Sequence, residues 1–145
     1  MKTEKGVILV VYKESRRQHR YAILKRKKNW EGWELPKGHL EEDNYKKTVK
    51  IELQEETGIK EENIRGITDM EETTSWEYEQ DGEDFKKEYK GFIVHVDDDA
   101  SIDTSQNPCD EHSQGFFLKK EDAKGLLEYE NNVEILDSAA RLMEN

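Results

Sequence analysis

The spacing of apolar and polar residues along the chain predicts a sheet of several strands. Residues 6–12 form a continuous apolar run rich in β-branched residues, which is typical of a strand in the middle of a sheet. Residues 21–26 follow across a polar turn and predict its hairpin partner. The expected strands lie at residues 6–12, 21–26, 33–35, 64–74 with an extension over 76–79, 89–96 and 115–118. An Asp-Gly pair at 81–82 predicts a tight turn before the strand at 89–96.

Three segments predict helices. The first begins after Asp43 or Asn44, either of which can cap it, and ends just before Gly58, which can adopt the left-handed conformation that closes a helix. The second has its core at residues 120–127, with acidic residues in its first turn. The third spans residues 131–143, and its apolar face consists of Val133, Leu136, Ala140 and Met143.

The order and type of these elements predict a fold of the α/β class (α+β type), in which a mixed β-sheet has helices on both faces. A chain of 145 residues has the ordinary size of one domain and is long enough to bury a core. The sequence contains no internal repeat, linker or low-complexity tract. We therefore expect a single domain over residues 1–145.

Composition and charge narrow the classes of partner. A formal net charge of −11 disfavours nucleic-acid backbones and acidic membranes as binding partners. No apolar run approaches the length of a membrane span and no signal-peptide pattern is present, so we expect a cytoplasmic protein. The single cysteine, Cys109, excludes an intrachain disulfide and a cysteine-based zinc site. We also expect a monomer.

Candidate chemistry is concentrated in three glutamates of the first predicted helix. Glu52, Glu55 and Glu56 are three and four residues apart, which puts their carboxylates on one helix face. Like charges held this close repel, and a hard cation such as Mg²⁺ or Mn²⁺ would neutralise them. The spacing alone fits a solvated acidic face equally well, because 39% of all residues are charged. His112 and the other histidines away from this region show no metal-ligand spacing.

This segment resembles the Nudix box, whose pattern is Gly, five residues, Glu, seven residues and then Arg-Glu-apolar-x-Glu-Glu-x-Gly-apolar. Residues 52–59 (Glu-Leu-Gln-Glu-Glu-Thr-Gly-Ile) match its second half position by position, and residues 35–39 (Leu-Pro-Lys-Gly-His) match its usual opening. The resemblance implies an α/β/α sandwich and a Mg²⁺- or Mn²⁺-dependent hydrolase of phosphoanhydride bonds. Glu52, Glu55 and Glu56 would then hold the metal, and Glu55 or Glu56 would take a proton from the attacking water.

Two positions depart from the box. Its opening loop is one residue short, so Asp43 or Asn44 stands where the box has its first Glu, and Ile51 stands where it has its Arg. In the family this arginine mainly forms an internal salt bridge that orients the glutamates. Lys47 and Lys50 lie close enough along the helix to substitute for it in part.

A second resemblance concerns residues 110–118, which are similar to a Glu-His-x-x-(small or aromatic)-aromatic segment of diadenosine polyphosphate hydrolases. It implies that Glu111 adds a carboxylate to the metal site from across the cleft, although the residues alone also fit an exposed loop glutamate. Residues 119–139 look like the same subgroup. In that subgroup aromatic residues near Tyr89 and Tyr129 stack on an adenine, and each tyrosine fits a place in the core as well.

Residues of the loop before the helix complete the expected substrate site. Lys37 can pair with a phosphate as a point charge or lie on the surface, and a backbone carbonyl near Lys37 and Gly38 would help to hold the metal. His39 can hydrogen-bond a phosphate, transfer a proton, or be satisfied by backbone. Trp30 is expected to flank the cleft.

These features together predict a metal-dependent Nudix pyrophosphohydrolase that acts on a small nucleotide. We expect it to resemble the bis(5′-nucleosyl)-tetraphosphatases and to convert diadenosine polyphosphates such as Ap4A into ATP and AMP. Nucleoside triphosphates, ADP-ribose and RNA 5′ ends are alternative substrates within the same chemistry. A nucleotide-binding domain with weak or lost turnover, which Ile51 suggests, and an acidic metal-buffering protein are alternatives from other classes.

Overall fold

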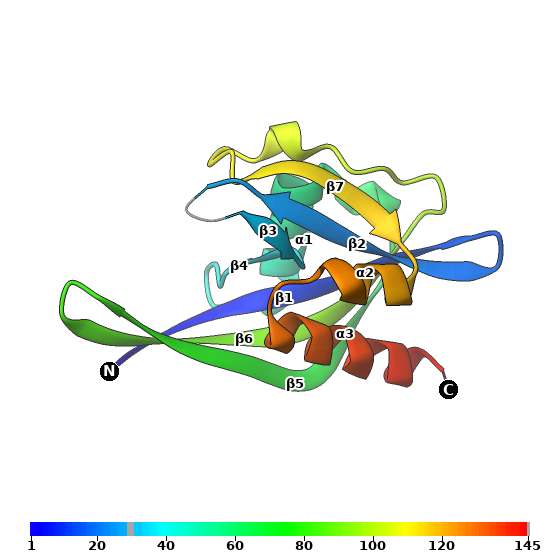
Figure 1. The fold of residues 1–145 in the computed structure, drawn as a ribbon. Coiled ribbons are helices and arrows are strands. Elements are labelled where there is room, and N and C mark those ends of the chain that lie inside the picture. Colours follow the sequence, from blue (N-terminus) through cyan, green and yellow to red (C-terminus); the bar gives the residue numbers. More distant parts are fainter. Residues whose placement is uncertain (29–30, 145) are drawn as a thin grey trace.

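The computed structural model describes residues 1–28 and 31–144, so Trp30 lies outside the described residues. Over these residues the chain forms a mixed seven-stranded β-sheet with helices on both faces (Figure 1). The strands are β1 (Lys2–Ser15), β2 (Gln18–Arg26), β3 (Gly32–Glu34), β4 (Lys37–His39), β5 (Ile64–Gln80), β6 (Glu83–Val96) and β7 (His112–Leu118). The helices are α1 (Tyr45–Thr57), α2 (Lys120–Leu126) and α3 (Glu130–Met143), with the 3-10 helices η1 (Glu61–Asn63) and η2 (Thr104–Gln106). Among the described helices, none has both the length and the apolar character needed to span a membrane.

Strand β1 lies in the middle of the sheet, as its apolar run predicts. The strand order is β3-β2-β1-β6-β5, and β4 and β7 add to β1 and β2 respectively. Strands β1 and β2 form the expected antiparallel hairpin, in which Tyr12 lies opposite Tyr21. Strand β6 runs parallel to β1, which makes the sheet mixed.

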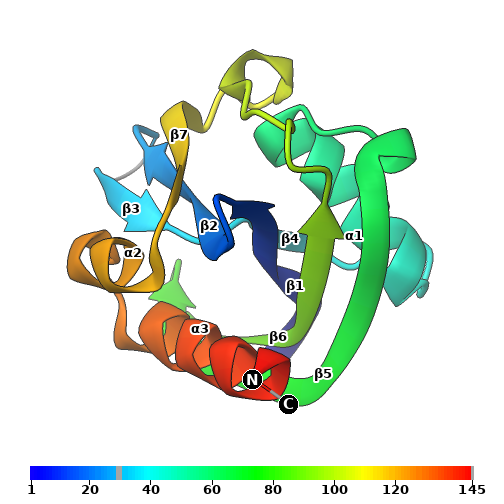
Figure 2. The same ribbon diagram turned by 90° about the vertical axis from the view of Figure 1, so that its right-hand side faces the viewer.

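The two faces of β1 pack against different helices. Successive side chains of a strand point to opposite faces, so Ile8 and Val10 pack with α2 and α3, while Leu9 packs with α1. Figure 2 shows the sheet between α3 on one side and α1 on the other. The predicted fold class, an α/β/α sandwich around a mixed sheet, is confirmed.

Helix α1 has the termini that the sequence predicts. The side chain of Asn44 accepts a hydrogen bond from Lys47 N, and Gly58 adopts the left-handed conformation with φ of 75°. The buried face of α3 differs from the prediction, because Ile135 and Ala139 lie at its centre. Both positions share the 3.6-residue period of the predicted face and were omitted from it.

The hairpin of β5 and β6 is longer than the sequence predicts. The two strands continue on both sides of a turn at Asp81 and Gly82, and Figure 1 shows their tip extending beyond the body of the protein. Strand β7 begins at His112, three residues before its predicted start at residue 115. The polar residues 112–114 hide this start in the sequence, because they pair with β2 although they are not apolar.

The loop that opens the box is held by direct pairing of β4 with β1. Gly6 lies opposite His39 and Val7 lies opposite Gly38, and Leu9 N donates to Pro36 O at 2.8 Å. A Cβ atom at Gly6 would overlap Gly38 O and the ring of the buried Tyr89. Glycine at position 6 therefore permits the close approach that positions the loop.

Gly6→Ala should lower the free energy of unfolding by about 1–3 kcal/mol, because the added methyl group meets backbone and a buried ring that cannot move away freely. Gly66→Ala is the matched control, since a Cβ there contacts nothing within 4 Å and the change should stay within about 0.5 kcal/mol. Urea unfolding of both variants checks the prediction. Equal stability of the two variants would contradict it.

Candidate functional site

Helix α1 presents its glutamates to a cavity of about 310 Å³. Glu52 and Glu56 are 8% and 2% exposed, and Glu55 is more accessible. The same cavity is bordered by Glu111 and by the predicted loop residues Lys37, Gly38 and His39. Tyr89 borders it as well, so the structure brings together eight of the nine residues that the sequence assigns to metal or substrate, all but Tyr129.

The backbone of β4 lies directly against Glu52. A Cβ atom at Gly38 would overlap the Glu52 carboxylate, so only glycine leaves this carboxylate in place. The N–H of the neighbouring Lys37 points to Glu56 Oε1 at a long distance of 3.5 Å. The loop therefore lines the cavity with backbone at the point where two of the carboxylates emerge from α1.

The carboxylates of this cavity are crowded enough to change their chemistry. Burial, with the negative charges of Glu56 and Glu55, raises the pKa of Glu52 to about 8. The pKa of Glu55 is also raised, by burial and then by Glu41 and Glu56. A bound cation would relieve this repulsion, and a set of carboxylate oxygens fits a hard divalent ion such as Mg²⁺ or Mn²⁺.

Glu111 reaches the cavity from the opposite side, at the start of β7. Its backbone O accepts from Lys27 N at 2.9 Å, and its Oε2 lies 3.4 Å from Arg26 Nη1. A bulge shifts the register of β7 on β2, so that Arg26 pairs with His112. Bulges re-aim side chains, and here Glu111 faces the cavity while His112 points into the interior.

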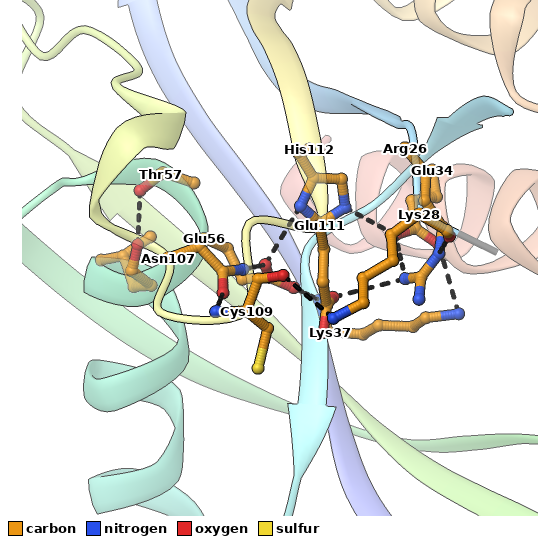
Figure 3. A network of polar contacts seen from close by, with 11 residues as sticks. Arg26, Lys28, Glu34, Lys37, Glu56, Thr57, Asn107, Cys109, Glu111 and His112 are labelled. Atoms are coloured by element: carbon orange, nitrogen blue, oxygen red, sulfur yellow. Dashed lines mark hydrogen bonds and ion pairs between the residues drawn. The ribbon is translucent and has the colours of Figure 1, made fainter. Parts of the chain in front are cut away.

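The interior beside the cavity holds a network of buried charges (Figure 3). His112 Nε2 lies 2.7 Å from Glu34 Oε2, and His112 Nδ1 lies 3.2 Å from Glu56 Oε2. Burial alone would lower the pKa of His112, but the two carboxylates raise it to about 9. Burial alone would raise the pKa of Glu34, but His112, Lys37 and Arg26 hold this pKa below its ordinary value.

The loop between β6 and β7 supplies another donor to Glu56. Asn107 Nδ2 donates to Glu56 Oε2 at 2.7 Å. The loop is fixed on the end of α1, since Asp103 N donates to Thr57 O at 2.7 Å. Thr57, the residue after Glu56, therefore helps to hold the loop whose Asn107 contacts Glu56.

Three cations separate the acidic cavity from a second cavity of about 510 Å³. Arg26, Lys37 and Lys87 border both cavities. Burial and the positive charges of Lys37 and Arg26 lower the pKa of Lys87. The acidic cavity thus favours a cation, while the adjoining cationic ridge, made of Arg26, Lys37 and Lys87, favours an anion.

The second cavity is lined by aromatic and polar side chains. Tyr129 is 49% exposed and borders it together with Trp76. Lys37 Nζ lies 5.0 Å from the centre of the Trp76 ring. Tyr89, which the sequence assigns to the same role, is only 2% exposed and packs against Trp76 with ring centres 5.1 Å apart. Tyr89 borders the acidic cavity and not the second one, so a stacking role for it at the second cavity rests on the resemblance alone.

The lysines of α1 do not replace the missing box arginine. Lys47 pairs with Glu42, and Lys50 Nζ lies 2.6 Å from Glu61 Oε1, so both point away from the glutamates of the cavity. Ile51 is partly buried. The prediction that either lysine supports the glutamates is wrong.

Sequence reasoning missed the groups that surround the glutamates. Glu34, His112 and Asn107 contact one another or Glu56 across long stretches of chain, and no local spacing relates them. Trp76 and Lys87 lie on strands whose alternation is obscured by charged residues. The one local signal for His112 is its place next to Glu111, because the resemblance assigns a role only to the glutamate of this pair.

Comparisons with known proteins agree with this arrangement. The sequence model of the NUDIX domain family matches residues 2–138. No curated protein sequence matches the chain. The fold is similar to a Caenorhabditis elegans Ap4A hydrolase in a binary complex, with a TM-score of 0.75 and 20% identity over 97% of this chain and 98% of that one.

Two other solved structures are similar to a comparable degree. The Escherichia coli dihydroneopterin triphosphate pyrophosphohydrolase has a TM-score of 0.74 and 17% identity, and 94% of this chain and 96% of that one are covered. The NUDIX domain of Shewanella oneidensis NrtR, complexed with ADP ribose, has a TM-score of 0.72 and 14% identity over 99% and 90% of the two chains. At such identities these likenesses concern the fold.

The raised pKa of Glu52 predicts how the stability of the metal-free protein depends on pH. With a folded pKa of about 8, Glu52 binds a proton more tightly in the folded state than in the unfolded chain. Stability is therefore lost as the pH rises from about 5 to about 8, by about 3–5 kcal/mol for this group. Glu52→Gln should remove that loss, as thermal unfolding across this pH range will show.

The effect of Glu52 has the same sign as that of His112 but can be separated from it by pH range. His112 has a pKa raised to about 9, so its stabilisation is lost only above about pH 6.5. Between about pH 5 and 6.5 the difference between wild type and Glu52→Gln reports Glu52 alone. Glu62→Gln, a change on the exposed η1, is the control and should follow the wild type. Parallel profiles for wild type and Glu52→Gln would refute the prediction.

Proposed function

Because the chain belongs to the NUDIX domain family, we propose that it is a Mg²⁺- or Mn²⁺-dependent hydrolase of diadenosine polyphosphates such as Ap4A, with ATP and AMP as products. The observation that carries this proposal is the spatial order of three adjoining surfaces. The cavity of carboxylates comes first, the cationic ridge comes next, and the cavity bordered by Tyr129 and Trp76 comes last. These surfaces fit, in the same order, a metal ion, a phosphate chain and a nucleoside.

In this proposal Glu52, Glu55, Glu56 and Glu111 hold the metal, with help from backbone near Lys37 and Gly38. A metal held by these residues would supply positive charge to the phosphate oxygens and a water molecule of lowered pKa. The raised pKa of Glu52 supports the assignment, because a crowded set of buried carboxylates gains stability when it binds a cation.

Glu55 suits the role of general base better than Glu56. Glu56 Oε2 already accepts from Asn107 and faces His112, so only Oε1 of this carboxylate remains available. Glu55 is more accessible, and burial with nearby carboxylates raises its pKa toward the range in which a base is effective. We therefore assign Glu55 the proton of the attacking water and Glu56 a metal-holding role.

Arg26, Lys37 and Lys87 bind the phosphate chain. Lys87 has a lowered pKa that an anionic phosphate would restore, since the anion offsets the repulsion from Lys37 and Arg26. Tyr129 and Trp76 provide ring surface for an adenine, and Tyr89 supports Trp76 from within the core. His39, 62% exposed at the rim, can donate to a phosphate oxygen.

A second candidate is a nucleotide-binding domain with weak or lost turnover. It is favoured by Ile51, which leaves α1 without the arginine of the box, since Lys47 and Lys50 pair elsewhere. Nucleoside triphosphates, ADP-ribose and RNA 5′ ends are alternative substrates of the same site. The NrtR domain, solved in complex with ADP ribose, has a similar fold.

Product analysis tests the proposal directly. Wild-type protein is incubated with Ap4A, ATP and ADP-ribose, each with Mg²⁺ and with Mn²⁺, and the products are separated by ion-exchange chromatography. Ap4A should yield ATP and AMP, and Glu55→Gln and Glu56→Gln should reduce the rate by about 10²–10⁴-fold. Glu62→Gln is the matched control. Nucleotide binding without turnover of any substrate would contradict the hydrolase and favour the nucleotide-binding domain.

The aromatic cavity generates a separate prediction about KM. Tyr129→Ala should raise KM for Ap4A by about 5- to 100-fold with little change in kcat, because base stacking contributes about 1–3 kcal/mol per base. Phe116→Ala is a closely matched control, since Phe116 is an aromatic residue with the same 49% exposure and borders neither cavity. Steady-state kinetics of the two variants decide, and equal KM values for both would argue against adenine binding at Tyr129.

A further inference from the structure

We infer that His112 is a positioning residue of the metal site. Its imidazole ring is held by Glu34 and in turn fixes the carboxylate of Glu56. The inference rests on the proposed hydrolase, in which Glu56 holds metal. It concerns a histidine that borders neither of the two cavities and has no side-chain exposure, so it does not touch substrate. It acts through Glu56.

The carboxylate of Glu56 is held by three segments of the chain. Oε2 lies 2.7 Å from Asn107 Nδ2 and 3.2 Å from His112 Nδ1, and Oε1 lies 3.5 Å from Lys37 N. His112 Nδ1 does not aim squarely at Oε2, so this contact is an ion pair rather than a well-formed hydrogen bond. With Oε2 occupied, Oε1 is the oxygen left to face a metal.

His112 is poorly suited to bind the metal itself. Although one of its nitrogens lies within 4.8 Å of oxygens of Glu56 and Glu111, both ring nitrogens face carboxylates. A carboxylate only accepts, so a ring between two of them carries a proton on each nitrogen and is a cation. A metal ligand needs a nitrogen without a proton.

Glu34 fixes the histidine in turn. Its Oε2 contacts His112 and Arg26, and its Oε1 lies 3.3 Å from Lys37 Nζ. Arg26 Nη1 also lies 3.4 Å from Glu111 Oε2. Alternating charges therefore run from Glu111 through Arg26, Glu34 and His112 to Glu56 (Figure 3), and they connect carboxylates that come from β7 and α1.

Within the described residues no lysine of α1 contacts Glu56, since Lys47 and Lys50 pair with Glu42 and Glu61, and Lys46 borders a separate surface hollow beside Lys50 and Glu61. The charge that faces Glu56 comes from the start of β7 instead. Outer-shell partners of metal ligands typically change metal affinity or activity 10- to 100-fold when they are removed. The ion pair of His112 with Glu56 predicts an effect of this kind.

The test compares Mn²⁺ binding and kinetics in wild type and His112→Gln. Free Mn²⁺ is measured by electron paramagnetic resonance without substrate. We expect Mn²⁺ binding to weaken by about tenfold and kcat to fall by at least about tenfold, with KM changed less than about threefold. If His112 acted only as a nearby positive charge, its removal would strengthen Mn²⁺ binding, and this opposite sign would overturn the inference.

Two further results would also overturn it. Val96→Ala, a change at a buried core residue that borders neither cavity, lowers stability without touching the site. If His112→Gln lowers the melting temperature but leaves Mn²⁺ binding and kcat as they are in Val96→Ala, the residue is merely structural. A nitrogen coupling in the spin-echo spectrum of bound Mn²⁺ that disappears in His112→Gln would make His112 a ligand.

A double variant covers the case in which His112→Gln does not fold. Glu34→Gln/His112→Gln removes the buried Glu34–His112 pair as a unit and leaves Arg26 its contact with Glu111, and we expect it to fold with the same loss of Mn²⁺ binding. The binding measurement needs no turnover. A wild type that hydrolyses no nucleotide would therefore defeat the proposed function, while the Mn²⁺ comparison would still decide the role of His112.

Discussion

Repulsion among the carboxylates that α1 brings together is the constraint on which the site depends. Glu52, Glu55 and Glu56 occupy less than two turns of helix, and burial makes their charges more costly than at the surface. The response differs from residue to residue. Glu52 favours its protonated form, whereas Glu56 is contacted by Asn107, His112 and the Lys37 N–H from three other segments. In the proposed function, Glu52 would exchange its proton for a metal ion while Glu56 is already held in place.

The fold produces this arrangement by bringing backbone and charge close to a single helix face. Pairing of β4 with β1 places Gly38 against Glu52, and it requires a residue without a side chain at Gly6. A bulge between β2 and β7 sends Glu111 toward the cavity and His112 away from it. Each device acts on the backbone, so the carboxylates are positioned by the sheet as well as by the helix.

The sequence predicted the parts whose signals are local. The N-cap at Asn44, the left-handed Gly58 and the apolar run of β1 each depend on neighbouring residues, and each is found in the structure. The contact of Glu34 with His112 spans 78 residues, and that of Glu56 with Asn107 spans 51. Such pairs follow from the register of β7 and the course of a loop, which periodicity does not encode. Glu111 was found only through resemblance to a subgroup.

The buried charges also bear on why this network is present at all. Replacing a buried ion pair by apolar residues of similar size is often neutral or stabilising, so such a pair is weak evidence for stability. Glu34 and His112 are each 1% exposed, and apolar side chains would pack at these positions without the free-energy cost of removing charges from water. What apolar residues would not provide is a fixed charge 3.2 Å from Glu56 and a link through Arg26 to Glu111. The pair therefore connects two carboxylates that border one cavity from different segments, an arrangement that folding does not require and that the proposed metal site would use.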